Sequence, residues 1–289
     1  MHPAPSVIIF SVFSGLGFGL LAYLGFGFVH LYGWAAFALW GLGYGLAVVG
    51  LLASTFHLGN PQRALKAFSQ WRSSWLSREA WASVATLLIL APVALSDWLG
   101  LGWPRLPGMI GAVLALATVF TTSMIYTQIR AVPRWHHWLT PVMFLTFSLA
   151  GGAILGGLGI APLLLVALAA VLLAIWRVGD GQFARAAQTL GTATGLDRIG
   201  AVTVFEQAHT AGNYLLREMI FVVGRKHAQK LRVIALVMAT VLPAILLTLC
   251  SGMWAFAFAG VIHLLGALAA RWLFFAEAEH VVGLYYRKR

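Results

Sequence analysis

The sequence predicts an all-α integral membrane protein, built as a bundle of about eight transmembrane helices. Apolar residues make up 61% of the 289 positions and charged residues only 9%, so there is too little polar surface to cover a water-soluble fold. Apolar stretches of about 20 residues, the length that crosses a bilayer core of about 30 Å, also recur along the chain. Most of the protein surface is therefore expected to face lipid.

The expected transmembrane helices follow the apolar runs between polar, Pro-containing or Gly-containing breaks. Their approximate ranges are 5–29, 35–57, 80–99, 107–129, 138–158, 161–179, 231–250 and 253–275. The first helix has no basic segment before it and no small-residue cleavage site after it, so we expect a retained helix and not a signal peptide. Together the helices form a single membrane-anchor domain over residues 1–289.

Residue usage argues against a catalytic centre in this chain. Its single cysteine, Cys250, lies in an apolar run, so the sequence offers neither a disulfide framework nor a set of thiolates for an iron–sulfur cluster. No phosphate-binding glycine loop, zinc-ligand spacing or serine nucleophile motif stands in a suitable context, and no metal site is expected. Any cluster or catalytic metal must then belong to a partner.

Histidine positions argue against bound haem, which would need two histidines from facing helices at the same depth. His57 lies at one membrane edge, His263 near the middle of the last helix and His30 at the other edge. Ionisable residues inside a membrane are costly, so His263 and Asp97 each suggest a function. For His263, the equal alternative is a hydrogen bond to a neighbouring helix.

Basic residues are distributed asymmetrically along the predicted topology. Eight crossings place both termini and the loops after the second, fourth and sixth helices on one side of the membrane. That side carries 18 of the 19 Lys and Arg residues, and only Arg105 lies opposite. By the positive-inside rule this side is cytoplasmic, so we expect the chain in the inner membrane with both termini inside. The net charge of +11 then reflects topology and not nucleic-acid binding.

The same side carries the long loops, of about 22 residues after the second helix and about 50 after the sixth. A partner subunit is expected to dock there. Apolar residues at helical spacing predict a helix at the cytoplasmic interface over 198–230, with a partner-free covering loop as the alternative. Glycines such as Gly17 and Gly43 favour close packing of the first two helices over a binding crevice.

The residues best placed for chemistry lie where the second helix ends and the third begins. His57 closes one helix and Glu79 opens the next, with Arg63 between them. A quinone headgroup needs hydrogen-bond donors and a proton route, which a histidine and a carboxylate supply. Structural roles compete, because Glu79 fits a first turn capped by Ser77, and Arg63 fits an interfacial anchor. Tyr126 reaches the same face, where its hydroxyl would complete the site or simply mark the interface.

Five segments of the sequence occur together in a specific order. They are HPAPSVIIFSVFSGLGFGLL at 2–21, HLGNPQRA at 57–64, WLSRE at 75–79, TTSMIY at 121–126 and HTAGNYLLREM at 209–219. With them, nearly the whole chain resembles the membrane-anchor subunits of the dimethyl sulfoxide reductase family of molybdenum enzymes. The resemblance implies an eight-helix, haem-free anchor that exchanges electrons and protons with quinone.

The resemblance also implies site residues, cofactors and partners. The family's headgroup positions fall on His57, Gly59, Arg63 and Glu79, and His57 and Glu79 would transfer protons. The quinone would be ubiquinone or menaquinone. Molybdopterin and iron–sulfur clusters would lie only in partners, namely an iron–sulfur subunit on the cytoplasmic face and a molybdopterin catalytic subunit.

Topology and resemblance together favour sulfite oxidation. Many relatives dock an exported catalytic module on the periplasmic face, whereas the basic residues here mark the docking face as cytoplasmic. The chain in this respect looks like the membrane subunits of cytoplasmically oriented sulfite dehydrogenases, which reduce quinone. Two alternatives stay open: a menaquinol-oxidising anchor of a dimethyl sulfoxide or related reductase, and a stand-alone transporter, for which internal repeats or helices broken at mid-membrane would be typical.

Overall fold

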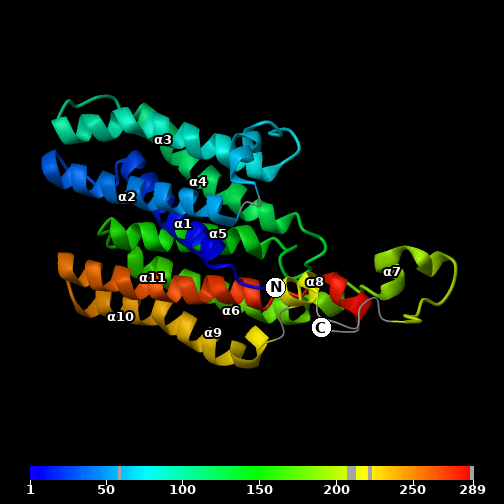
Figure 1. Cartoon of the computed structure of the whole chain (residues 1–289). Helices are drawn as coiled ribbons and strands as arrows, with labels where there is room; N and C mark the ends of the chain where they lie inside the picture. The colour runs from blue at the N-terminus through cyan, green and yellow to red at the C-terminus, as the bar shows by residue number, and fades with distance from the viewer. Residues whose placement is uncertain (58–59, 207–212, 221–222, 287–289) are drawn as a thin grey trace.

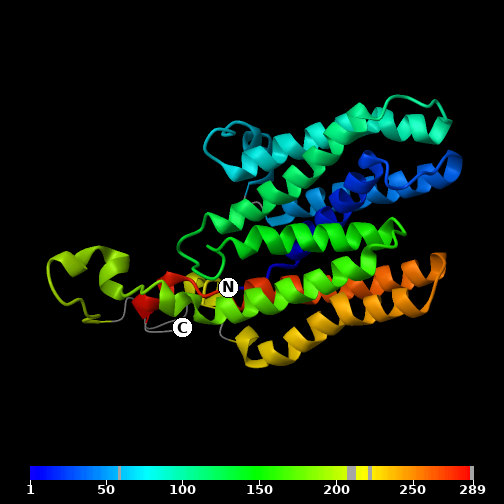
Figure 2. The same cartoon turned by 180° about the vertical axis from the view of Figure 1, so that it is seen from behind.

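The computed structural model describes residues 1–57, 60–206, 213–220 and 223–286. In this part of the chain every regular element is helical, and the long helices run side by side as one bundle in both cartoon views (Figures 1 and 2). The predicted all-α membrane class is confirmed.

Eight helical segments of the described chain form the bundle. They are α1 (Pro5–Phe26), α2 (Gly33–Ala53), α3 (Trp75–Leu99), α4 (Leu106–Thr127), α5 (Leu139–Leu155), α6 (Ala161–Arg185), a composite of α9 (Ala228–Leu236), a π-helical turn (Val237–Val241) and α10 (Leu242–Leu249), and α11 (Met253–Ala276). Seven of these segments are long and apolar enough to cross a membrane, whereas α5 has 17 residues. At 1.5 Å per residue α5 is about 26 Å long, near the lower limit for a crossing.

Helix α1 packs against α2, α4, α5 and α11, and its glycines explain how it fits among them. A Cβ atom added to Gly17 would collide with the α2 backbone at Ala47, and one added to Gly19 would collide with the carbonyl of Ser148 on α5. Gly43 of α2 meets the side chains of α1 in the same way. Small residues therefore let these backbones approach closely, as predicted for the first two helices.

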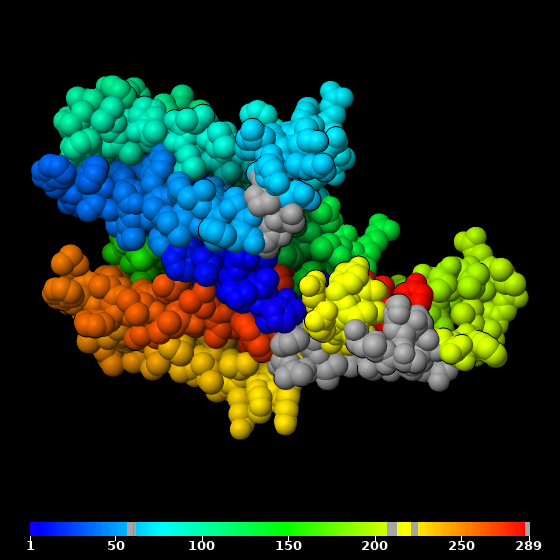
Figure 3. Space-filling view, in the orientation of Figure 1, coloured from blue at the N-terminus to red at the C-terminus, as the bar shows by residue number. Residues whose placement is uncertain are grey.

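The termini and the long connections gather at one end of the bundle, which we call the loop-bearing end (Figure 1). It holds both termini and the connections after α2, α4 and α6. The segment around α7 (Leu190–Thr194) projects beyond it (Figure 3). The opposite end has only short connections, at 27–32, 100–105, 156–160 and 250–252.

A charge network joins the helix ends at the loop-bearing end. Arg134, from the connection between α4 and α5, lies 3.1 Å from Asp180 of α6 and 2.7 Å from Glu277, which follows α11. Arg232 of α9 binds both carboxylates as well, with 2.6 Å between its Nε and Glu277. Two cations thereby balance two carboxylates, as the burial of Glu277 requires.

At the opposite end, Arg105 forms an ion pair with Asp97 at 3.1 Å. Trp40 Nε1 donates to the same carboxylate, also at 3.1 Å. This pairing gives Asp97 a structural role. It also neutralises the basic side chain that the sequence places at this end.

Helix α3 begins earlier than predicted, at Trp75 instead of near residue 80. Ser74 occupies its N-cap position, so the predicted capping role of Ser77 is wrong. Ser77 Oγ instead donates to the carbonyl of Ala67 in the preceding segment. Glu79 therefore lies in the second turn of α3 and not at its first. A search for apolar runs misses this first turn because its polar side chains bond the loop.

The predicted interfacial helix over 198–230 is wrong for the described residues. No helix occurs from Ile199 to Phe205, and both of these side chains are largely exposed. Among the described residues between Ile199 and the start of α9, the helical elements are the short α8 (Tyr214–Glu218) and the 3-10 segment η4 (Val223–His227). Helical spacing alone did not produce a helix here, because short helices are marginal unless an apolar face packs against something.

His263 bonds to a neighbouring helix where a proline interrupts that helix. Pro243 has no N–H, so the carbonyl of Ala239, one turn earlier, loses its α-helical donor. A π-helical turn forms at Val237–Val241, and His263 Nδ1 lies 2.6 Å from the Ala239 carbonyl. Because a carbonyl oxygen only accepts, Nδ1 carries the proton and donates it. Of the two readings of His263, the structure shows the hydrogen bond between helices.

Candidate functional site

Polar side chains from four helices lie at a common depth near the loop-bearing end. Ser11 is the seventh residue of α1 and Glu79 the fifth of α3, while Thr122 and Arg271 are the sixth from the ends of α4 and α11. At 1.5 Å per residue, these positions lie about 6–9 Å below the helix ends. All four residues are buried. We call them the polar layer.

Glu79 is the carboxyl of this layer and is only 4% exposed. Thr122 Oγ1 donates to its Oε1 at 2.5 Å. The same hydroxyl lies 2.9 Å from the carbonyl of Thr118, so the carboxyl is the closer acceptor. A buried ionisable group within a membrane helix is costly and generally serves a function. Its position near the helix ends suits it to exchange protons with a ligand from the loop-bearing end.

Arg271 is a buried cation, 4% exposed, for which the described residues provide no ion pair. Its Nη1 has no hydrogen-bond partner among them either. The guanidinium carbon lies 3.7 Å from the centroid of the Phe144 ring, with Phe147 and Phe274 farther away. Cation–π contacts are worth about 2 kcal/mol when desolvated, less than the several kcal/mol that burial of a charge costs. Aromatic packing alone therefore does not account for this residue.

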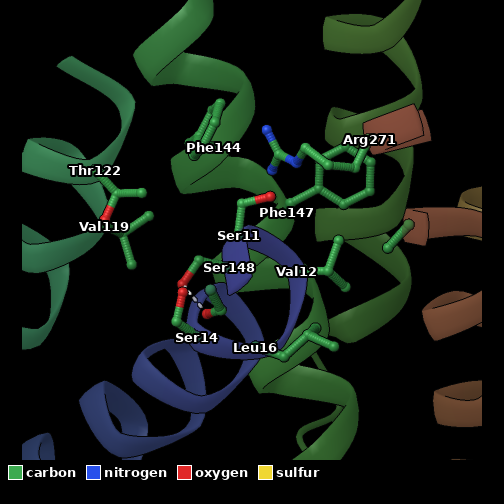
Figure 4. Close-up of a pocket in the computed structure, with 12 residues that line it drawn as sticks. Ser11, Val12, Ser14, Leu16, Val119, Thr122, Phe144, Phe147, Ser148 and Arg271 are labelled. Atoms are coloured by element: carbon green, nitrogen blue, oxygen red, sulfur yellow. Dashed lines mark hydrogen bonds between the residues drawn. The ribbon is translucent and has the colours of Figure 1, made fainter. Parts of the chain in front are cut away.

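A small cavity lies between Arg271 and Thr122 (Figure 4). Its walls come from α1, α4, α5 and α11 and include the hydroxyl groups of Ser11, Ser14 and Ser148. The guanidinium end of Arg271 points into it (Figure 4). The space open to the centre of a water molecule is about 20 Å³. That is room for water and too little for a ring-sized ligand.

Tyr126 belongs to the same region of the bundle. It is 7% exposed, which excludes the role of an ordinary interfacial tyrosine. Its ring packs against Trp135, Phe144, Phe274 and Phe275. Tyr126 lies one turn along α4 from Thr122, which bonds Glu79. Its ring contacts Phe144, whose ring also lies against the Arg271 guanidinium. The structure thus brings together two of the predicted site residues, Glu79 and Tyr126.

The other predicted site residues fall in the connection between α2 and α3. Arg63 is exposed in η2 (Pro61–Phe68) and does not enter the polar layer. His57 ends η1 (Ser54–His57), directly after α2, so its backbone lies at the loop-bearing end. The side chain of His57 and the whole of Gly59 lie outside the described part of the chain.

Sequence reasoning missed Arg271 and Thr122 as site residues. Arg271 was counted only among the basic residues of the cytoplasmic side, and Thr122 is one of several hydroxyl residues in TTSMIY. One signal was available for Arg271. Five residues of the run WLFFA separate it from the end of α11, which indicates a position inside the helix.

Fold and site define a multi-spanning membrane protein in which Glu79 and Arg271, two buried ionisable residues without ion pairs among the described residues, lie near the end with the long loops. The family model described as DMSO reductase anchor subunit (DmsC) matches residues 1–275. The chain belongs to this family. It is therefore a membrane anchor within a multi-subunit complex of the dimethyl sulfoxide reductase type.

Individual relatives agree with this assignment. A sulfite dehydrogenase subunit of Allochromatium vinosum is 31% identical over 330 aligned positions, which cover 99% of both proteins. Two anaerobic dimethyl sulfoxide reductase proteins of Escherichia coli K12 each match 37% of this sequence. One is 29% identical over 39% of its own length, and the other, YnfH, is 33% identical over 38%. No solved structure matches the protein significantly.

Proposed function

We propose that this protein passes electrons between a docked iron–sulfur subunit and the quinone pool, and binds the quinone headgroup at the loop-bearing end beside Glu79. One observation carries the proposal. The carboxyl group of Glu79 is buried within the membrane part of a DmsC-family anchor, about 6 Å from the end of α3 at the loop-bearing end, where a partner could dock. A headgroup at that depth is reachable from the lipid, from a docked cluster and from water.

Quinone reduction requires hydrogen-bond donors to the headgroup oxygens and a route that supplies protons. Conversion of a quinone into a quinol consumes two electrons and two protons, one proton at each oxygen. In this proposal Glu79 exchanges a proton with one headgroup oxygen, and Thr122 holds the carboxyl in place at 2.5 Å. His57, the last residue of the η1 segment that follows α2, donates to the headgroup and carries the other proton. Gly59 and Arg63 belong to the proposed binding residues by resemblance to the family, and Tyr126 closes the inner side.

The orientation proposed for the complex follows from charge. In the topology predicted from the sequence, the side of the membrane with the long loops carries 18 of the 19 Lys and Arg residues, and we take it as cytoplasmic. The iron–sulfur subunit docks on this end and in turn holds a molybdopterin catalytic subunit. The anchor contributes no catalytic molybdenum centre of its own.

Sulfite is the proposed electron donor of the complex. The relative that matches along 99% of both proteins is named as a sulfite dehydrogenase subunit, whereas the two dimethyl sulfoxide reductase proteins match 37% of this sequence. Membranes that contain the complex should reduce quinone when sulfite is added. Quinol-dependent reduction of dimethyl sulfoxide without sulfite-dependent activity would favour the alternative, a menaquinol-oxidising reductase anchor.

The substitution Glu79→Gln tests the quinone site, because it keeps the shape of the side chain and removes its exchangeable proton. Quinone-linked turnover of the assembled complex should fall by about 10²–10⁴-fold, the usual contribution of a positioned proton-transfer group. Oxidation of the same substrate with an artificial soluble acceptor should stay unchanged. A quinone-analogue inhibitor should still bind with an affinity within a few-fold of the parent complex.

Asp97→Asn is the matched control, since it alters a carboxylate of the same helix at the opposite end. It should leave quinone-linked turnover close to that of the parent protein. If Glu79→Gln is no slower than Asp97→Asn, Glu79 is a structural residue and the proposed site is wrong.

A further inference from the structure

We propose that the cavity beside Arg271 is an internal water site, and that its water links Arg271 to Thr122 and so positions Glu79. The inference rests on the proposed function for its catalytic consequence. The water site itself rests on the cavity and on the buried guanidinium group of Arg271, which lines the cavity and has no ion pair among the described residues.

The donor and acceptor groups on the cavity walls fit water. Ser11, Ser14 and Ser148 give their hydroxyl protons to the carbonyls of Ile8, Phe10 and Gly15, so their oxygens retain only acceptor capacity. Arg271 Nη1 is a donor that has no partner among the described residues. A ligand in the cavity must accept from Arg271 and donate to hydroxyl oxygens. Water does both, whereas a quinone carbonyl only accepts.

The size of the cavity also fits water. The cavity volume of about 20 Å³ exceeds the 10–15 Å³ that one water molecule needs, so it holds one or two. Polar cavities of this size are normally hydrated, because the water satisfies groups that would otherwise be buried without partners. The headgroup of the proposed function must then bind outside this cavity.

The hydrogen bonds form a chain with a single direction. Arg271 donates to water, water donates to Thr122 Oγ1, and Thr122 donates to Glu79 Oε1. Each donation strengthens the next, since a polarised hydroxyl is a better donor. Thr122 also lies within reach of the Thr118 carbonyl, at 2.9 Å against 2.5 Å for Glu79. Water polarised by Arg271 keeps the Thr122 proton on the carboxyl and leaves the second carboxyl oxygen for the headgroup.

Hydroxyl-radical footprinting in ¹⁸O-labelled water tests the water site in the intact complex. Phe144 and Phe147 line the cavity and are 3% and 7% exposed, and Phe18, 1% exposed, does not line it. If water is present, the first two residues should be labelled well above Phe18. Arg271→Met should lower that labelling several-fold, and Arg271→Lys, which restores a donor, should recover it. Labelling of Phe144 and Phe147 no higher than that of Phe18 would overturn the proposal.

Kinetics test the link to Glu79. Thr122→Val removes the hydroxyl at almost constant shape, and Thr121→Val is the matched control because Thr121 bonds only carbonyls of its own helix. Thr122→Val and Arg271→Met should lower quinone-linked kcat at least about ten-fold, with KM and quinone-analogue affinity within about two-fold of the parent complex. Arg271→Lys should recover most of the rate.

Two outcomes would refute the link. One is a Thr122→Val variant as fast as Thr121→Val. The other is an Arg271→Met variant that loses analogue affinity more than kcat, which would place the headgroup in the cavity. Failure of the proposed function itself gives a different result, in which Glu79→Gln, assayed beside these variants, leaves quinone-linked turnover normal.

Discussion

Buried charges in this protein fall into two groups. Asp97 and Glu277 each have arginine partners within about 3 Å and serve the architecture. Glu79 is held by a threonine hydroxyl, and Arg271 by aromatic rings, in the part of the chain that the structure describes. The ion-pair partner of a buried charge offsets the free energy of its desolvation. Glu79 and Arg271 have no such partner among the described residues, so the structure alone does not explain why they are buried. Function is therefore argued from the second group.

At this scale His57→Ala should impair quinone-linked turnover, because it removes a headgroup donor at the end of α2. Loss of one hydrogen bond in a partly apolar site costs about 1–3 kcal/mol, or about 5- to 150-fold in affinity for a quinone analogue. The complex should still assemble and oxidise its substrate with a soluble artificial acceptor. His30→Ala, which alters an exposed histidine at the opposite end, is the control. Normal quinone-linked rates in His57→Ala, or failure to assemble, would favour a structural histidine.

At the scale of elements, helix breaks are matched by side chains from neighbouring helices. Pro243 breaks the seventh membrane segment, the π-helical turn absorbs the break, and His263 of α11 supplies the missing donor to Ala239. Gly266, one turn along α11, allows the approach, since a Cβ there would collide with the backbone of Ala239. The two last membrane segments are thus joined at mid-membrane.

A double-mutant cycle measures this compensation. His263→Ala leaves the Ala239 carbonyl without its donor and should destabilise the protein by about 1–3 kcal/mol. In a Pro243→Ala background the backbone regains an N–H at position 243, so the same histidine substitution should cost less. Thermal unfolding in detergent would report the coupling as non-additive shifts. Additive effects of the two substitutions would show that proline and histidine act independently.

At the scale of the whole molecule, the even number of crossings determines where a partner can bind. Both termini and the long connections emerge at one end, and the opposite end has only short turns (Figure 1). The basic residues that the structure describes lie at the same end, except for Arg105, which is paired with Asp97. In the proposed function, the docked partner, the proton supply and the quinone site therefore share this end of the bundle.

This placement predicts reporter behaviour. A fusion after Arg289 should be active as a cytoplasmic reporter and inactive as alkaline phosphatase, because the basic end stays inside. A fusion in the connection at 100–105 should give the opposite result and serves as the control. Phosphatase activity at the C-terminus would invert the topology and remove the support for a cytoplasmic sulfite-oxidising complex.

Much of the fold followed from composition and periodicity alone. The long apolar runs predicted the helices because a bilayer demands a defined length of apolar chain, and the structure has the predicted bundle. The same reasoning did not predict the amphipathic segments correctly. The first turn of α3 was missed, and the expected helix over 198–230 did not form in the described residues, since neither is decided by crossing lipid.

Composition and hydropathy were sufficient to predict the membrane class, the number of crossings and the candidate carboxyl, Glu79. The residues that surround this carboxyl became known from the folded bundle. Arg271 is 192 positions from Glu79 in the sequence (271 minus 79). The two residues lie at the same depth because α3 begins and α11 ends at the loop-bearing end. Hydropathy predicts the depth of a residue in the membrane, because each segment that crosses the lipid must itself be apolar enough to do so. Which residues meet at that depth depends on how the helices pack, and the packing is set by contacts between segments distant in sequence.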